Sequence, residues 1–426
     1  MMTIKIKPNC ADNPEFGTLP VNDALARILA AVQSVTGYEK IPVQEACGRV
    51  LYHAVHSFVR VPPFTNSAMD GFALNRADLP PAGQTTELVI IGTALAGKPF
   101  ESTVGSGETV RVMTGAVIPD GADTVVIQEH VEISDQTIRI DARHTPGQNV
   151  RQAGEDIQPG DCVLEAGLLC APADVGIIAS MGIAEVSVYR KLRVAVFSTG
   201  SEVCDLGQQR AGVSQQTFIY DSNRYSLCAA LGKLPIEVVD MGIIPDDPAL
   251  LQSVLLDASH HADLIITSGG VSVGEADYTK QVLSELGSVD FWTVAMKPGR
   301  PIAFGKINSA VLFGLPGNPV AVMVTWCFLL KPALEKMLGI SASAIIPSFI
   351  ATSTSSIRKR SGRTEFQRGI LTQQEHGKWT VKTTGKQGSG ILTSMSKANA
   401  FIVLEHDRGG VEAGDEVLVY PFSGLF

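Results

Sequence analysis

The chain has 426 residues, of which 45% are hydrophobic and 18% are charged, and its formal net charge is −9. This length predicts about three domains, and the apolar content allows large cores and excludes an intrinsically disordered chain. The acidic balance argues against a general nucleic-acid or membrane-surface binder, because either would need a basic face.

Cysteine usage and apolar runs indicate the compartment. Seven scattered cysteines without a C-x-x-C pair suggest neither a disulfide framework nor a zinc site, and reduced thiols are typical of the cytoplasm. The N-terminus lacks the apolar core of a signal peptide. The longest apolar run, "VAVMVTWCFLL" at 320–330, ends at Lys331-Pro332 and is shorter than the about 20 residues that span a bilayer. We expect a soluble cytoplasmic protein.

The first half of the chain changes character twice. Residues 21–36 repeat apolar side chains with a helical period, and Gly37 is expected to end that helix. Short β-rich runs punctuated by Gly, Pro and Asp then follow from about 62 to 150, which predicts a small all-β module. The segment 172–183 is helical again, with Pro172 at a permitted first-turn position. The β module therefore looks inserted between helical segments.

From residue 191 onward, strand-like and helix-like segments alternate. The strand-like runs are continuously apolar, which is typical of a mostly parallel sheet covered by helices on both faces. From about 345 the pattern is β-rich, with turn residues at intervals suited to a small barrel or sandwich.

Unusual loops follow the predicted parallel strands, at the edge where open α/β sheets bind ligands. The loop "SGGVSVGEAD" at 268–277 begins with two glycines, "LPGNP" occupies 315–319, and "AMKPGRP" at 295–301 supplies two cations, Lys297 and Arg300. Three further loops, "STGSE" at 198–202, "YDSN" at 220–223 and "IPDD" at 244–247, are acidic. Together with the glycine loop they supply the candidate acids Glu202, Asp221, Asp246, Asp247 and Asp277.

Two interpretations of these loops remain open. Asp221, Asp247 and Asp277 each precede a predicted helix, where an Asp accepts first-turn N–H groups, and no Walker A motif is present. In combination, however, several carboxylates at one edge repel each other without a cation. Mg²⁺ prefers oxygen ligands and substrate phosphates, and glycine N–H groups with two cations favour phosphate. The combination predicts a Mg²⁺–phosphate site for a small phosphorylated molecule.

Loops of the β module are also unusual. The segments 62–73, 111–126 and 150–157 combine Pro, Asp, Gly, Thr and Arg in a way that ordinary turn chemistry explains. Periodicity alone does not place them near the α/β cleft.

Seven motifs occur in one order along the chain: "NSAMDGFA", "VMTGAVIPDGADTVV", "VRQAGEDI", "STGSE", "SGGVSVGEADYTK", "VAMKPGRP" and "GLPGNPVAV". Together they resemble the molybdopterin molybdenumtransferase family, which includes the bacterial MoeA proteins and the C-terminal part of gephyrin. The resemblance extends from about residue 20 to the end of the chain.

The resemblance implies a multidomain α/β plus β fold. Its parts would be an elongated helical N-terminal dimerisation domain (20–61 and 152–190), an inserted β domain (62–151), a central MogA-like α/β/α domain with a mostly parallel sheet (191–344) and a C-terminal β-barrel domain (345–426). It further implies a homodimer whose site is shared between subunits.

The implied activity is insertion of molybdate into adenylylated molybdopterin, with Mg²⁺-dependent cleavage of the phosphoanhydride and release of AMP. Molybdopterin adenylyltransferase and apo-molybdoenzymes would be partners. Three alternatives remain: an adenylyltransferase, whose single-domain members lack the inserted β module; a non-catalytic scaffold; and a tungsten-inserting relative, which the sequence alone does not separate.

The resemblance also transfers site residues motif by motif. The residues that resemble catalytic positions are Asp70, Thr114, Glu202, Asp246, Asp277 and Lys297, with Glu202, Asp246 and Asp277 as metal ligands. Those that resemble binding positions are Arg151, Gly269, Gly270, Ser272, Arg300, Pro316, Pro319, Arg368 and Ser389. Asp70 and Thr114 would face the α/β domain of the partner subunit. Arg300 replaces a common Lys, and Thr293 stands where some relatives carry a Lys, which puts one anion contact in doubt.

Overall fold

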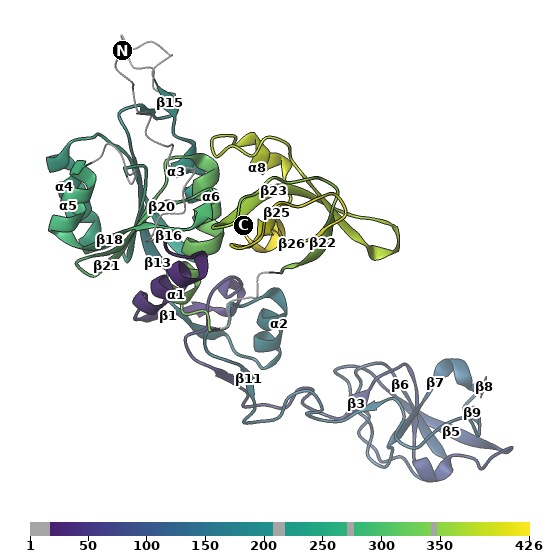
Figure 1. Ribbon diagram of the computed structural model, residues 1–426. Coiled ribbons are helices and arrows are strands. Elements are labelled where there is room, and N and C mark those ends of the chain that lie inside the picture. Colours follow the sequence, from purple (N-terminus) through teal and green to yellow (C-terminus); the bar gives the residue numbers. More distant parts are fainter. Residues whose placement is uncertain (1–17, 208–217, 271–276, 342–346) are drawn as a thin grey trace, which may run out of the picture.

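The computed structural model describes residues 18–207, 218–270, 277–341 and 347–426, with the side chains of 277–280 left out. Figure 1 shows an α/β unit packed beside a C-terminal β unit, a small mixed unit adjoining both, and a second β unit at the far end of a narrow connection. The four parts follow the composition changes along the sequence.

The central unit is a six-stranded sheet with the order β16-β13-β17-β21-β20-β18. The strands from β16 to β21 are mutually parallel, and β20 and β18 extend the sheet in antiparallel pairing. The mostly parallel sheet is therefore confirmed. Its strands are β13 (Leu192–Thr199), β16 (Ile236–Ile244), β17 (Leu264–Ser268), β18 (Gly287–Thr293), β20 (Pro301–Ile307) and β21 (Ala310–Leu315).

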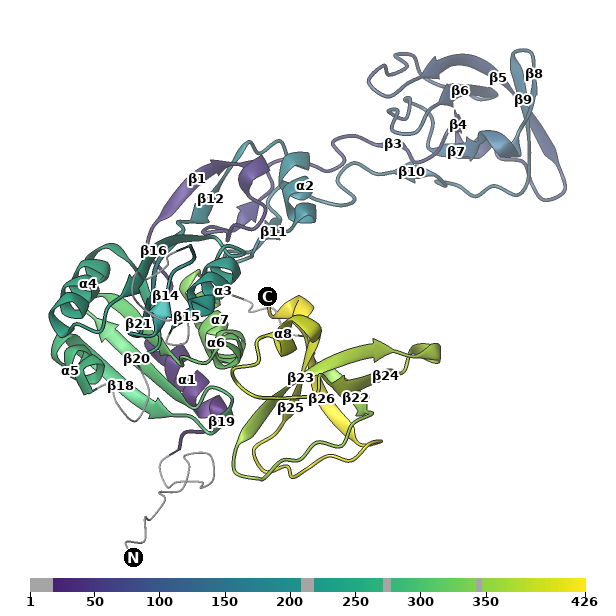
Figure 2. The same ribbon diagram turned by 90° about the horizontal axis from the view of Figure 1, so that it is seen from above.

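Helices cover both faces of this sheet (Figure 2). One face packs Ile266 and Phe313 against α3 (Ser222–Leu231) and α6 (Pro319–Thr325). The other face packs Ile265 and Leu312 against α4 (Pro248–His261) and α5 (Asp277–Leu286). Apolar residues on both faces explain why these strands read as continuous apolar runs.

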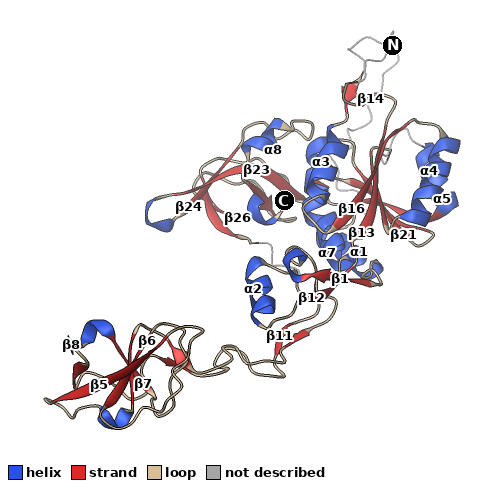
Figure 3. Ribbon diagram, turned by 180° about the vertical axis from the view of Figure 1, so that it is seen from behind, coloured by secondary structure: helices blue, strands red, loops and turns tan. Residues whose placement is uncertain are grey.

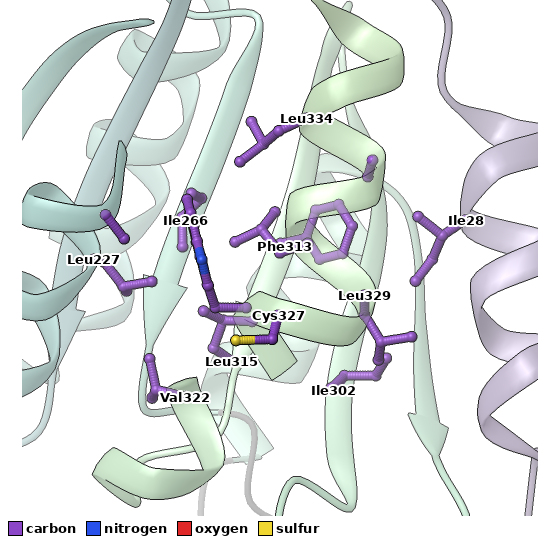
Figure 4. Packing of buried hydrophobic residues seen from close by; sticks show 14 of the residues in the cluster. Ile28, Leu227, Ile266, Ile302, Phe313, Leu315, Val322, Cys327, Leu329 and Leu334 are labelled. Atoms are coloured by element: carbon purple, nitrogen blue, oxygen red, sulfur yellow. The ribbon is translucent and has the colours of Figure 1, made fainter. Parts of the chain in front are cut away.

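The first helix, α1 (Val21–Ala31), packs on the α/β core, although the predicted bounds 20–61 assign it to the N-terminal domain. Figure 4 shows its Ile28 beside the cluster that contains Phe313 and Leu329. The helix is shorter than the predicted 21–36. Val32 is extended and buried, and Val35 N–H bonds the Met337 carbonyl at 2.9 Å, so tertiary contacts override the helical pattern.

The helical segment over the apolar run at 320–330 continues beyond Lys331-Pro332. A π-helical turn (Trp326–Leu330) follows α6 and leads directly into α7 (Lys331–Met337). Proline removes one helical hydrogen bond and crowds the carbonyl four residues earlier, and the wider turn before Pro332 relieves that crowding. No helix within the described ranges is long and apolar enough to cross a membrane.

The N-terminal unit is mixed, and the expected helical character is not confirmed. Strand β1 (Tyr38–Pro42) pairs with β12 (Glu185–Tyr189), and β2 (Val55–His56) pairs with β11 (Cys162–Leu164). These strands share a core with α2 (Pro172–Ser180), which carries Pro172 at its predicted first-turn position. Short strands supply the framework because Val, Ile and Tyr dominate these runs.

The inserted unit is all β, as predicted, with a six-stranded sheet of order β7-β4-β6-β5-β9-β8. Two antiparallel segments, β3 (Asn66–Ser67) and β10 (Val150–Arg151), pair where the chain enters and leaves it. Figures 1 and 2 place this unit far from the α/β sheet. Its strands are β4 (Gly71–Leu74), β5 (Thr85–Ala94), β6 (Glu108–Val112), β7 (Thr124–Ile127), β8 (Glu132–Ser134) and β9 (Thr137–Asp141).

The C-terminal unit is a closed barrel, which confirms the predicted β-barrel. Its strand order β23-β24-β22-β26-β25 closes because β25 also pairs with β23. A short strand of the α/β unit, β19 (Met296–Lys297), pairs with the start of β23, and Figure 3 shows the two units side by side. The elements are β22 (Phe349–Ser353), β23 (Thr364–Gln373), β24 (Trp379–Thr383), α8 (Thr393–Lys397), β25 (Ala400–Leu404) and β26 (Glu416–Pro421).

Candidate active site

The carboxyl ends of the parallel strands meet at one sheet edge, as predicted. Strands β16, β13, β17 and β21 end there at Ile244, Thr199, Ser268 and Leu315. The segment between β18 and β20 lies at the same edge, because β20 runs antiparallel to β21. The sheet therefore gathers the acidic loops, the glycine pair, the "LPGNP" loop and the two cations.

A pocket of about 220 Å³ opens between the loops after β13 and β16. Asp246 lines it, as do Ser201 and Val203, the two neighbours of Glu202. Asp205 also lines it and was not among the predicted site residues. The complete lining is Gly200, Ser201, Val203, Cys204, Asp205, Ile243, Pro245 and Asp246.

A buried arginine beside this pocket was also missed. Arg224 on α3 is 4% exposed and forms ion pairs with Asp205, Asp221 and Asp240. Its place in the sequence carries a signal, since Arg224 shares the spacing of the buried Leu227 and Leu231. An arginine on the apolar face of a helix needs buried acidic partners there, and this requirement is the signal that could have found the cluster.

The capping explanation is confirmed for two of the acids. Asp221 accepts the Arg224 N–H at 3.1 Å at the start of α3, and Asp247 accepts the Leu250 N–H at 3.0 Å at the start of α4. Asp277 begins α5, but its side chain lies outside the described residues, as does all of Ser272.

The glycine pair is required by close packing at the strand ends. Gly269 has φ +93°, and a Cβ there would lie 2.6 Å from the Thr199 carbonyl oxygen. Gly270 has φ +69°. Both conformations favour glycine. The Asn223 Nδ2 group donates to Ser268 Oγ and to the Gly317 carbonyl, each at 2.8 Å, and so ties the glycine loop to the "LPGNP" loop.

The prolines and cations of the site are also at this edge. Pro316 is buried, and Pro319 begins α6. The Lys297 Nζ lies 3.5 Å from Glu365 Oε1, a buried carboxylate of the barrel that also accepts from Arg363 Nε at 3.1 Å. The barrel of the same chain therefore contacts the cationic segment, which includes Arg300.

Arg368 and Ser389 lie where the barrel touches α6. The Arg368 guanidinium, 1% exposed, donates to Ser394 Oγ at 3.0 Å and to the Gly388 carbonyl at 3.1 Å. Burial lowers the pKa of Arg368 to about 10, so the side chain stays charged at neutral pH. The Ser389 carbonyl accepts the Val320 N–H at 3.0 Å. Arg368 thus shapes the loop that packs on the "LPGNP" helix.

Asp70, Thr114 and Arg151 are not brought to this edge within the chain. Asp70 Oδ1 accepts the Thr114 N–H at 2.7 Å and its hydroxyl at 2.8 Å, and these two bonds lower the pKa of Asp70. Arg151 is exposed on β10. All three belong to the distant inserted unit or its connection (Figure 1).

The donor set suits a hard cation only in part. Carboxylates with Ser and backbone oxygens are the ligands that Mg²⁺ prefers. Among the residues that the structure describes, however, no three His, Cys, Asp or Glu side chains converge tightly enough to hold a metal alone. Mg²⁺ commonly keeps waters and substrate phosphates, so Glu202 and Asp246 beside one pocket are compatible with it.

Comparison with models of known protein families shows the class of protein to which the chain belongs. The chain is a multidomain protein whose residues 195–336 match the family model described as "Probable molybdopterin binding domain". Residues 19–182 match "MoeA N-terminal region (domain I and II)", and residues 351–422 match "MoeA C-terminal region (domain IV)".

Individual relatives of the chain indicate the same family as these models. The chain is 43% identical over 408 residues to the molybdopterin molybdenumtransferase of Haemophilus influenzae, covering 96% of this chain and 99% of the relative. It is 34% identical to the protein of that name from Nostoc, covering 89% and 88%. The crystal structure of the Pyrococcus horikoshii molybdopterin biosynthesis MoeA protein superposes with a TM-score of 0.82 at 29% identity, covering 95% and 100%. The chain belongs to the MoeA family of molybdopterin molybdenumtransferases.

Proposed function

We propose that the chain is a transferase of molybdenum cofactor biosynthesis that inserts molybdate into adenylylated molybdopterin, cleaves the phosphoanhydride and releases AMP. The observation that carries this proposal is the sheet edge, which holds a pocket lined by Asp205 and Asp246 at its β16–β13 end, the glycine and "LPGNP" loops in its middle, and the cationic segment at its β20–β18 end. The family membership supplies the substrate class.

In this proposal the phosphates contact the glycine loop, the cations and the "LPGNP" loop. The Gly269 N–H donates to the Leu315 carbonyl at 3.2 Å, so the N–H of Gly270 is the one that would contact phosphate oxygens. Lys297 and Arg300 add charge that holds phosphate or molybdate oxygens. The Asn223 bonds to Ser268 and Gly317 fix the relative positions of the two loops. Much of the catalysis would be positioning of molybdate near the dithiolene.

Glu202, Asp246 and Asp277 would hold Mg²⁺ together with the substrate phosphates. The cation supplies stabilisation of the charge that builds on the leaving phosphate. Glu202 and Asp246 are exposed beside the pocket, so they are accessible to a hydrated ion.

The inserted unit supports a homodimer in which Asp70 and Thr114 act on the partner subunit's cleft. In one chain these residues are far from the α/β edge (Figures 1 and 2). Large apolar side chains are exposed along the same stretch: Phe58 (86%), Val59 (40%), Phe64 (42%) and Met69 (44%). Exposed apolar side chains so close in sequence are typical of a contact surface, and a second copy of this chain would cover them.

Reconstitution tests the function. Purified protein is mixed with adenylylated molybdopterin, Mg²⁺, molybdate and an apo-molybdoenzyme, and AMP release and recovered enzyme activity are followed. We expect both to depend on the protein and on Mg²⁺. Adenylylated pterin formed from molybdopterin and MgATP would instead show an adenylyltransferase. Unchanged rates in Asp70→Ala and Asp277→Ala would show a scaffold, and a preference for tungstate would show a tungsten-inserting enzyme.

The proposed cellular context follows from the substrate. The protein would work in the cytoplasm, with the molybdopterin adenylyltransferase before it and apo-molybdoenzymes after it.

A further inference from the structure

One guanidinium joins three separate elements beside the pocket. Arg224 Nη2 lies 2.7 Å from Asp205 Oδ1, Nη1 lies 2.5 Å from Asp240 Oδ2, and Nε lies 3.0 Å from Asp221 Oδ2. Tyr225 adds a hydroxyl bond to Asp205 Oδ1 at 2.9 Å. The planar fork of arginine meets several carboxylates at fixed angles, which a lysine does not do.

The joined elements carry the two walls of the pocket. Asp205 lines the pocket itself, on the loop that contains Glu202. Asp240 lies in β16, which leads to Asp246 on the opposite wall, and also accepts the Gly242 N–H at 3.0 Å. Asp221 anchors the arginine to the first turn of α3.

The surrounding carboxylates keep Arg224 charged and hold it in its ion pairs. Burial disfavours the charged form of Arg224, but the hydrogen bonds that it donates to Asp240 and Asp221 outweigh this effect and raise its pKa. Three carboxylates around one guanidinium leave a net charge of −2, so removing the cation would leave three like charges close together beside the pocket.

We propose that Arg224 is a positioning residue that fixes the separation of the two pocket walls, and thereby the mutual placement of Glu202 and Asp246. Its link to cation binding rests on the proposed function. Loss of such supporting contacts typically weakens metal binding about 10–100-fold.

Two variants test the proposal. Arg224→Lys keeps the charge but removes the fork, and Tyr225→Phe removes only the hydroxyl bond to Asp205. Arg193→Gln is the matched control, because Arg193 pairs with Glu237 across the same two strands, β13 and β16, with both side chains more than half exposed. Folding of each variant is checked by thermal unfolding.

Two measurements are made on the full-length protein. Hydrogen exchange follows the amide of Val203, which lines one wall, and the amide of Gly242, which bonds Asp240 on the strand that leads to the other wall. Binding of Mn²⁺ alone, as a probe of the cation site, is followed by loss of the free-ion EPR signal. For Arg224→Lys we expect faster exchange at both amides and an Mn²⁺ dissociation constant raised by at least about tenfold. Tyr225→Phe should show smaller changes in the same direction, and Arg193→Gln neither change.

The outcomes separate this proposal from the function. Unchanged exchange in both Arg224→Lys and Tyr225→Phe overturns the positioning role, and if Arg224→Lys does not fold, Tyr225→Phe alone decides. Faster exchange with unchanged Mn²⁺ affinity also overturns it, since the role would then be structural only. If the unchanged protein binds no Mn²⁺ while exchange responds as expected, the walls are positioned by Arg224 and the metal assignment of the proposed function fails instead.

Discussion

At the scale of residues, Thr114 lowers the pKa of Asp70 by donating two hydrogen bonds, one from its backbone N–H and one from its hydroxyl. The variant Thr114→Val removes only the hydroxyl bond. We expect the pKa of Asp70 to rise, yet to stay below its ordinary value, because the backbone bond is the larger cause of the lowering. A ¹³C NMR titration of the carboxyl groups measures this shift.

The sign of the pH effect follows from that lowering. A carboxylate whose folded-state pKa is depressed contributes stability above its unfolded pKa and loses it as pH falls through the folded value. Thr114→Val should therefore lose less stability on acidification than the unchanged protein. Asp141, whose pKa Arg143 lowers to about 2, is the control within the same spectra and should not move. An unmoved Asp70 resonance would contradict the role of the hydroxyl.

Asp246 offers a second test at this scale. Asp246→Asn keeps the size of a pocket-lining side chain and removes its charge. We expect the Mg²⁺ concentration for half-maximal AMP release to rise by at least about tenfold. Asp257→Asn is the control, because that carboxylate is 71% exposed on α4, away from the pocket. An equal response of the two variants would count against a cation near Asp246.

At the scale of elements, the absence of a side chain at Gly269 allows the ends of β13 and β17 to lie close together. Gly269→Ala combines a left-handed backbone with a Cβ 2.6 Å from the Thr199 oxygen. We expect a loss of about 1–3 kcal/mol in the free energy of unfolding, measured by urea denaturation. Gly176→Ala is the opposite control, since it lies in α2 with open space around it and should stabilise by about 0.5–1 kcal/mol. A neutral Gly269→Ala would show that the strand ends adjust freely.

Elements were predictable where one physical rule governs them. Alternating strand and helix patterns predicted the parallel sheet, and a parallel sheet places its loops at one edge, so the meeting of the loops after β13, β16, β17 and β21 was foreseen. The predicted end of the helix over 21–36 was wrong, because buried contacts of Val32 and Val35 hold that segment in an extended conformation.

The site was predictable only in outline. The capping acids Asp221 and Asp247 have the same local sequence context as ligands, so only coordinates separate the two roles. The pairing of Arg224 with Asp205 and Asp240 depends on how a loop, a helix and a strand come together, which no periodicity reports.

At the scale of the whole molecule, a site shared between subunits predicts complementation. Asp70→Asn would disable the inserted unit, and Asp246→Asn would disable the cleft when Mg²⁺ is kept well below the raised half-maximal concentration of that variant. In randomly mixed dimers of the two variants, half are heterodimers with one intact site each, so about a quarter of the activity should return. AMP release before and after co-refolding measures it. Activity that stays absent in confirmed heterodimers would place both residues on one chain's own site.

The inserted unit is joined to the rest of the chain by two covalent crossings rather than one. The crossings run side by side, paired through β3 and β10 and again at Val61 with Ile157. A single tether permits rotation about its own axis, whereas a double ribbon resists winding and bends most easily across its flat side. We therefore expect the inserted unit to move mainly by bending of this connection about one axis. Its reach toward a neighbouring molecule would then depend on a single bending angle.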